Sequence, residues 1–115
     1  MMTLERIESF EVDRAGNLVR KVVPKRGKPY QHICTLACYE AVSHAAEEIG
    51  EAGFVLDDLA ARADVPFTQA AVALAFFKER GCVITERKRN YPAGPGLHAD
   101  AMLEYWALRE SKPQG

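Results

Sequence analysis

FVLDDLAARADVPFTQAAVALAFFKERGCV, residues 54–83, is the stretch with the clearest structural pattern in this sequence. Its apolar residues recur with the 3.6-residue period of an α-helix. The spacing predicts a short helix over 57–63, a tight turn, and a second helix over 67–80. In the second helix Ala70, Leu74 and Phe77 fall at i, i+4 and i+7 and share one inward face. We expect Leu59 and Val65 to pack against that face.

The turn between these two helices carries a recognisable pattern. A small residue, Ala60, is followed four positions later by a turn residue, Asp64, and then by an apolar residue, Val65. Asp64 stands where glycine is usual, and aspartate tolerates left-handed backbone better than most residues. The pattern resembles the helix-turn-helix of the winged-helix superfamily, found mostly in DNA-binding proteins. The resemblance extends without a gap to Val83 and implies a winged-helix domain over about residues 35–91, roughly half of the chain.

Further helix and strand signals flank this stretch. A helix is expected from Tyr30 or Thr35 to Ile49, ended by Gly50 or Gly53. Its apolar stripe would be Cys34, Cys38, Val42, Ala45 and Ile49. A wing strand over 83–88 should turn at Arg89-Asn90. Because prolines and glycines over 92–96 disfavour a return strand, we expect a stunted wing whose sheet is completed by N-terminal strands.

The two ends of the chain add elements to this core. Residues 7–23 alternate apolar and polar positions around the turn sequence of residues 13–17, which predicts a two-stranded hairpin. A basic connector bounded by Pro24 and Pro29 follows. A last helix is expected over 97–109. The predicted fold is therefore an α+β winged helix-turn-helix domain with an N-terminal β-hairpin and an additional C-terminal helix. Its parts are residues 1–29, 30–96 and 97–115.

Length and composition suit one small globular domain. The chain has 115 residues and an apolar content of 48%, enough to form a core. It contains no run of about 18–20 apolar residues that could span a membrane. The charged N-terminus does not resemble a signal peptide. Its three cysteines include no CxxC pair. We therefore expect a cytoplasmic, reduced protein without membrane association.

Basic and acidic residues are segregated along the chain although the net charge is −1. Six basic residues and no acid lie between Arg14 and Lys28, and three more form the run Arg87–Arg89. Seven acids against the single Arg62 lie between Glu40 and Asp64. Such segregation favours one basic face for a polyanion, with two solvated surfaces as the alternative.

These charges and the family resemblance favour a small DNA-binding protein, with transcriptional regulation among the possible roles. The expected DNA contacts are two polar residues of the third helix and five basic residues outside it: Thr68, Gln69, Arg87, Lys88, Arg89, Lys25 and Arg26.

The predicted outward face of the third helix departs from the usual DNA-reading pattern. It would contain Phe67, Thr68, Gln69, Ala71, Val72, Ala75 and Phe76. An exposed apolar run at Val72, Ala75 and Phe76 would need a cover. The alternative function is therefore a protein-interaction module without direct DNA readout. Its interface would be a twofold dimer contact built from Val72, Phe76, Met102 and Trp106.

Candidate chemical groups are few. Cys34 and Cys38, near His32 and His44, suggest a metal or redox site, but both cysteines continue an apolar stripe, which favours a structural role. Ser43 and His44 are neighbours on a helix and project about 100° apart, so they cannot form a catalytic pair. We find no catalytic constellation and expect no enzyme activity, metal or cofactor.

Overall fold

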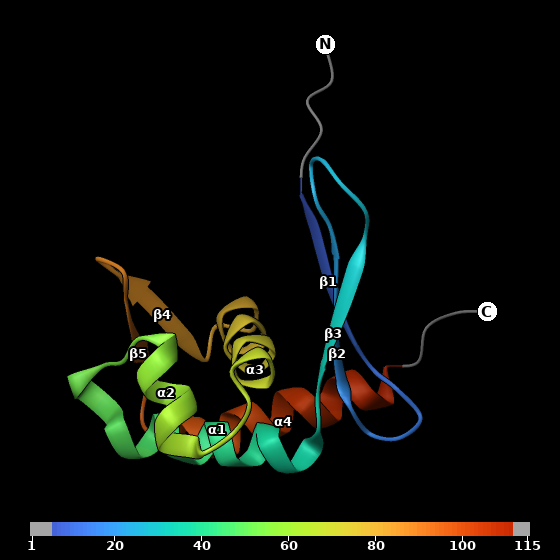
Figure 1. Ribbon diagram of the computed structural model, residues 1–115. Coiled ribbons are helices and arrows are strands. Elements are labelled where there is room, and N and C mark those ends of the chain that lie inside the picture. Colours follow the sequence, from blue (N-terminus) through green and yellow to red (C-terminus); the bar gives the residue numbers. More distant parts are fainter. Residues whose placement is uncertain (1–5, 112–115) are drawn as a thin grey trace.

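The computed structural model describes residues 6–111, which form an α+β fold (Figure 1). In those residues four α-helices accompany a three-stranded sheet of order β1-β2-β3 and a two-stranded sheet of β4 and β5. The elements are β1 Ile7–Val12, β2 Leu18–Val23, β3 Tyr30–Cys34, α1 Leu36–Ile49, the short 3-10 helix η1 Gly50–Ala52, α2 Leu56–Ala63, α3 Phe67–Glu79, β4 Val83–Glu86, β5 Arg89–Pro92 and α4 Leu97–Glu110.

The segment from α2 to α3 matches the sequence prediction closely. Helices α2 and α3 differ from the predicted bounds by one residue at most. Asp64 ends α2 in the left-handed conformation, with φ 56° and ψ 51°. The next backbone amide, that of Val65, donates to the carbonyl of Ala60 at 3.2 Å, which closes the turn. Leu59 and Phe77 are fully buried in the common core.

Helix α1 begins after Thr35, so the alternative start at Tyr30 is wrong. The Thr35 hydroxyl accepts a hydrogen bond from the amide of Cys38 at 3.2 Å and caps the helix. The five residues before this cap form β3 and pair with β2. Cys34 therefore ends a strand, and it does not share a helix face with Cys38. The predicted central part of the chain, residues 30–96, therefore includes β3, which belongs to the N-terminal sheet.

The N-terminal sheet has three strands where the sequence predicted two. The predicted connector between Pro24 and Pro29 is the turn that leads from β2 into β3, and both strand pairs are antiparallel. Figure 1 shows this sheet as an arm that rises from the helices. Leu18 and Cys34 at its base are buried in the core beside α3, and Val22, nearer the tip, is buried as well.

Strands β4 and β5 form a hairpin with a fully paired return strand, which was not predicted, and its turn comes earlier than predicted. The turn lies at Arg87 and Lys88, both with positive φ, and not at Arg89-Asn90. Pro92 still pairs with Val83, because a proline at the end of a strand needs no amide donor there. The expectation that N-terminal strands complete this sheet is wrong. A short bridge between Phe54 and Asn90 extends it, with two backbone hydrogen bonds of 2.9 Å.

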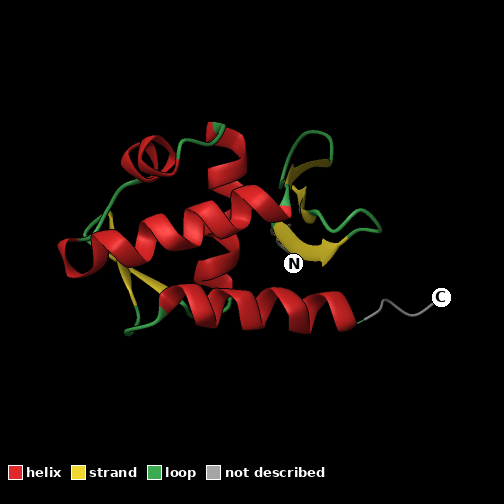
Figure 2. Cartoon of the chain, turned by 90° about the horizontal axis from the view of Figure 1, so that it is seen from below, coloured by secondary structure: helices red, strands yellow, loops and turns green. Residues whose placement is uncertain are grey.

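Helix α4 lies alongside α1 (Figure 2). It buries Leu97, Ala101 and Tyr105. Two tyrosine hydroxyls tie it down. Tyr39 of α1 donates to the carbonyl of Ala101 at 2.6 Å, and Tyr105 donates to the carbonyl of Gly16, in the β1–β2 turn, at 2.6 Å. Within residues 6–111, no helix combines the length and apolar character needed to cross a membrane.

Candidate nucleic-acid interface

Val72 and Phe76 of α3 are inaccessible, which overturns the prediction that they form an exposed interface. Both side chains have a relative exposure of 0%. The ring of Phe76 lies 5.2 Å from that of Phe10 in β1 and 6.1 Å from that of Tyr39 in α1, measured between centroids. The N-terminal sheet therefore covers this side of α3 within one chain.

The open side of α3 is narrower than the sequence predicted. It carries the exposed side chains of Thr68 and Lys78, with the half-buried Ala71 and Ala75 between them. Gln69 is half-buried, and its Oε1 atom accepts a hydrogen bond from the amide of Thr35 at 3.0 Å. This bond links α3 to the start of α1 and engages a group that was expected to contact a DNA base. The two alanines leave room for close approach by a ligand.

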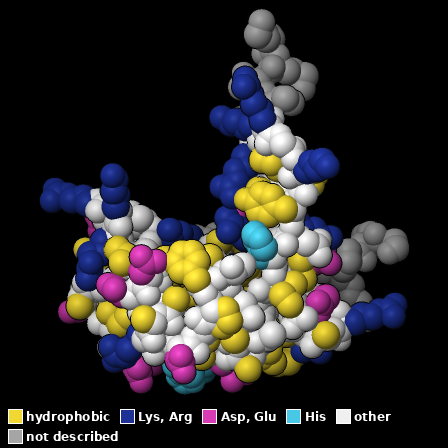
Figure 3. Space-filling model, viewed as in Figure 1, with side chains coloured by type: hydrophobic (Ala, Val, Ile, Leu, Met, Phe, Trp, Pro, Cys, Tyr) yellow, Lys and Arg dark blue, Asp and Glu magenta, His cyan; other side chains and the backbone are white. Residues whose placement is uncertain are grey.

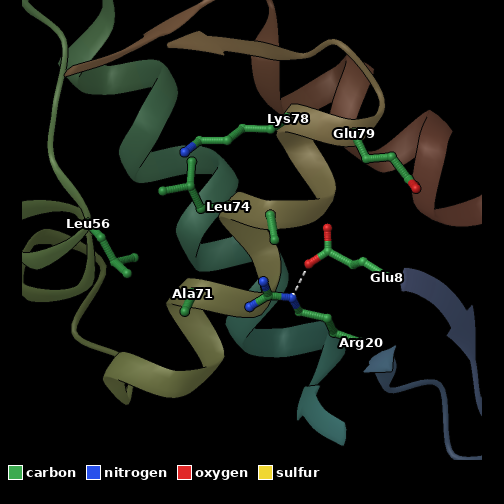
Figure 4. A pocket seen from close by; sticks show the side chains of 8 residues that line it. Glu8, Arg20, Leu56, Ala71, Leu74, Lys78 and Glu79 are labelled. Atoms are coloured by element: carbon green, nitrogen blue, oxygen red, sulfur yellow. Dashed lines mark hydrogen bonds and ion pairs between the residues drawn. The ribbon is translucent and has the colours of Figure 1, made fainter. Parts of the chain in front are cut away.

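A cleft of about 510 Å³ separates this side of α3 from the arm (Figure 4). Arg20 of β2 and Glu8 of β1 line the arm side and form an ion pair. Lys78 and Glu79 line the end of α3. Because the charges at Arg20 and Glu8 compensate each other, the cleft itself is close to neutral.

Uncompensated positive charge lies at two projecting tips. Lys25, Arg26 and Lys28 are exposed in the β2–β3 turn, and Arg87 and Lys88 are exposed in the β4–β5 turn. None of these five forms an ion pair with any residue in 6–111. Figure 3 shows Lys and Arg side chains gathered at both tips, which project from the same side of the helical layer, as Figure 1 shows.

Arg89, the third residue of the predicted basic run, has a different role. Its Nε atom donates to the carbonyl of Ala52 at 3.1 Å and its Nη2 atom to the carbonyl of Gly53 at 3.0 Å. These bonds hold the β4–β5 hairpin against η1. Arg89 therefore differs in role from its neighbours Arg87 and Lys88, and their adjacency in the sequence did not reveal this difference.

The cysteines occupy different environments. Cys34 is fully buried, and burial raises its pKa to about 12. Cys82 is buried as well, and desolvation again raises its pKa. Cys38 is half-buried, so the predicted burial is confirmed for Cys34 only. No group of three or more His, Cys, Asp or Glu side chains in the described chain is placed to hold a metal ion.

Sequence reasoning did not find a contact between α1 and α4. The His44 and His98 rings stack with centroids 3.6 Å apart. The Ser43 hydroxyl donates to the carbonyl of Glu40, so Nδ1 of His98, 2.6 Å from it, is the donor in their hydrogen bond. Ser43 has a relative exposure of 0%. Its hydroxyl is therefore a structural group that a substrate cannot reach.

The outward face of α4 also differs from the predicted interface. Met102 is half-buried against the core, and Trp106 has a relative exposure of 43%. Leu103 is more exposed, at 68%. Leu103 and Trp106 are three residues apart and thus lie on one face of the helix.

The chain matches no protein-family model, no curated protein and no solved structure. Its function is accordingly inferred from the geometry described above.

Proposed function

We propose that this chain is a winged-helix protein that binds DNA through phosphate contacts from its two basic tips. Three features support the winged-helix assignment. The order α1-α2-α3-β4-β5 agrees with the resemblance, Asp64 makes the left-handed turn before α3, and Phe54 adds a bridge to the β4–β5 hairpin.

The placement of positive charge carries the proposal for DNA. The tips at 24–29 and 87–88 flank α3 and project on one side of the molecule (Figure 1). Long, unpaired lysine and arginine side chains are suited to phosphates, which dominate non-specific DNA affinity. The exposed polar side chains on the open side of α3 are Thr68, Lys78 and Glu79, so we expect little discrimination between sequences.

Titration of a labelled random-sequence duplex, at about 50 mM and 200 mM salt, tests this function. One variant carries Arg87→Ala and Lys88→Ala, and another carries Lys25→Ala, Arg26→Ala and Lys28→Ala. Both should bind all sequences more weakly. The slope of log affinity against log salt should flatten by roughly 0.9 for each phosphate that the variant no longer neutralises.

The control variant carries Arg62→Ala and Arg109→Ala. It also removes two positive charges, but from the end of α2 and the end of α4. Its affinity should stay close to that of the parent protein. If the control and the tip variants weaken binding equally, net charge is responsible and the tips are not the contacts. Absence of duplex binding at the lower salt concentration would reject the DNA function.

Contact with a second copy of the chain is the second candidate function. The observation in its favour is the exposed apolar pair Leu103 and Trp106 on α4, since large apolar side chains placed together on a surface favour association. Val72 and Phe76 have no part in this contact because they are buried.

A further inference from the structure

One face of the arm looks toward α3, and the strand register identifies its residues. Arg20 pairs with His32, Val22 with Tyr30, and Leu18 with Cys34. Side chains alternate along a strand, so these six residues share one face of the sheet. Leu18 and Cys34 are buried in the core beside α3. Val22 is also buried, so the exposed part of this face lies on β3, toward the basic tip.

Two ring side chains stand in the open part of this face. Tyr30 has a relative exposure of 43%, and His32 is exposed beside it, with 5.2 Å between ring centroids. Phe10, on the same face of the neighbouring β1, instead packs on Phe76. Phe10 and His32 both lie beside Arg20 in the register, so core packing uses the ring on β1 and leaves the two rings on β3 uncovered. Figure 3 shows hydrophobic and histidine side chains on the arm below its basic end.

Positive charge borders these rings. Tyr30 begins β3 immediately after the turn that carries Lys25, Arg26 and Lys28. Arg20 lies directly across from His32 in the register and is held in place by Glu8. The turn therefore contributes uncompensated positive charge next to Tyr30, whereas the charge of Arg20 is balanced by Glu8.

Exposed rings beside basic side chains that form no ion pair are suited to bind single-stranded nucleic acid. Its bases offer free faces for stacking and its phosphates attract lysine and arginine. In a duplex the bases are already stacked on one another, so side-chain rings cannot reach their faces.

We infer that the arm binds single-stranded nucleic acid, with bases stacking on Tyr30 and His32 and phosphates lying along the 25–28 turn. This inference rests on the proposed nucleic-acid function and adds a preference for unpaired strands. Lys25, Arg26 and Lys28 then contact the backbone of either form, whereas the two rings contact the single strand alone.

The test compares a labelled thymidine oligonucleotide with a duplex of equal length, at one salt concentration. The parent protein should bind the single strand more tightly. Tyr30→Leu keeps apolar bulk but removes the ring, and it should weaken single-strand binding about ten-fold. His32→Ala should act in the same direction, and Tyr30→Phe should retain the parent affinity. Duplex affinity should stay unchanged in all three variants.

Val23→Ala and Ile33→Ala are the matched controls, because both remove exposed apolar side chains from the opposite face of the arm. They should leave both affinities unchanged. Equal affinity of the parent for the two forms, or no effect of Tyr30→Leu on the single strand, would overturn the inference while duplex binding through the tips persists. Failure of the parent to bind either form would instead reject the proposed function itself.

Discussion

Gly53 shows how one residue can determine the position of the β4–β5 hairpin. Its backbone has φ 76° and ψ 170°, a region that is almost restricted to glycine. A Cβ atom there would lie 2.6 Å from Cε1 of Tyr91 and 3.0 Å from the carbonyl oxygen of Asn90. Gly53 therefore permits both the chain direction and the close approach of β5 that the Phe54–Asn90 bridge requires.

Replacing Gly53 by alanine should destabilise the fold and loosen this hairpin. Gly81→Ala is the control, since Gly81 also has φ +76° but an added Cβ would meet nothing within 4 Å. We expect the free energy of unfolding of Gly53→Ala to fall by about 1–3 kcal/mol more than that of Gly81→Ala. Urea denaturation of both variants measures the difference. Equal decreases would mean that the contact with Tyr91 is relaxed at no cost.

The three thiols should differ in their reaction with a disulfide reagent at neutral pH. Cys34 should not react in the native state, because it is buried and its pKa is raised to about 12, which leaves almost no thiolate. Cys82 should also react slowly, whereas the half-buried Cys38 should react first. Labelling followed by peptide mass analysis assigns each site. Rapid labelling of Cys34 before Cys38 would contradict the described burial.

At the scale of elements, α3 is a core helix along most of its length. Six of its residues are buried, and they do not follow a single apolar stripe, because α1 and α2 pack on one side and the N-terminal sheet on another. The sequence periodicity located the helix correctly. It did not reveal how many neighbours would cover it, which is why Val72 and Phe76 were expected at the surface.

Two phenylalanines of α3 provide a direct test of this arrangement. Phe76→Ala should lower the free energy of unfolding by about 3–5 kcal/mol, the usual cost of a cavity left by a buried aromatic ring. Phe67→Ala, at a position with a relative exposure of 54%, should change it by no more than about 0.5 kcal/mol. Chemical denaturation of the two variants makes the comparison. A Phe76→Ala protein as stable as Phe67→Ala would show that the arm does not pack on α3.

At the scale of the whole molecule, two surfaces remain available to partners. The arm and the β4–β5 hairpin flank α3 on one of them, and the outward side of α4 carries Leu103 and Trp106. Basic residues dominate the tips of the first surface, while the second carries two large apolar side chains. A dimer formed through α4 would therefore leave the basic tips free for DNA.

Self-association can be tested by sedimentation at micromolar concentration. If α4 is the contact, the intact chain should sediment as a dimer. The double variant Leu103→Glu with Trp106→Glu should be monomeric, because each protomer would have to bury two carboxylate charges in the interface. Glu110→Lys, which changes an exposed charge on the same helix, is the control and should remain dimeric. A monomeric parent protein would reject the dimer, and a dimer that persists in the double variant would place the contact elsewhere.

Local patterns in the sequence were enough to determine where the four helices lie. A 3.6-residue period, the Asp64 turn and the glycines after α1 involve residues within a few positions of one another, so their signal is readable without the fold. The strands β1 and β2 and both basic clusters were also visible in this way. Strand β3 was missed because Tyr30 and Cys34 fit equally well as the first residues of a helix, whereas in the structure the cap at Thr35 separates them from α1.

Only the tertiary structure decided which of these residues are accessible. Phe10 covers Phe76 from a position 66 residues earlier in the chain, and Arg89 binds carbonyls of Ala52 and Gly53 more than 30 residues away. Burial and hydrogen bonding of this kind depend on which distant segments meet, and sequence periodicity reports only one face of one element. For the same reason the charges at 25–28 and 87–88 were visible in the sequence as two clusters, whereas their position on one side of the molecule followed from the packing of the arm and the hairpin around α3.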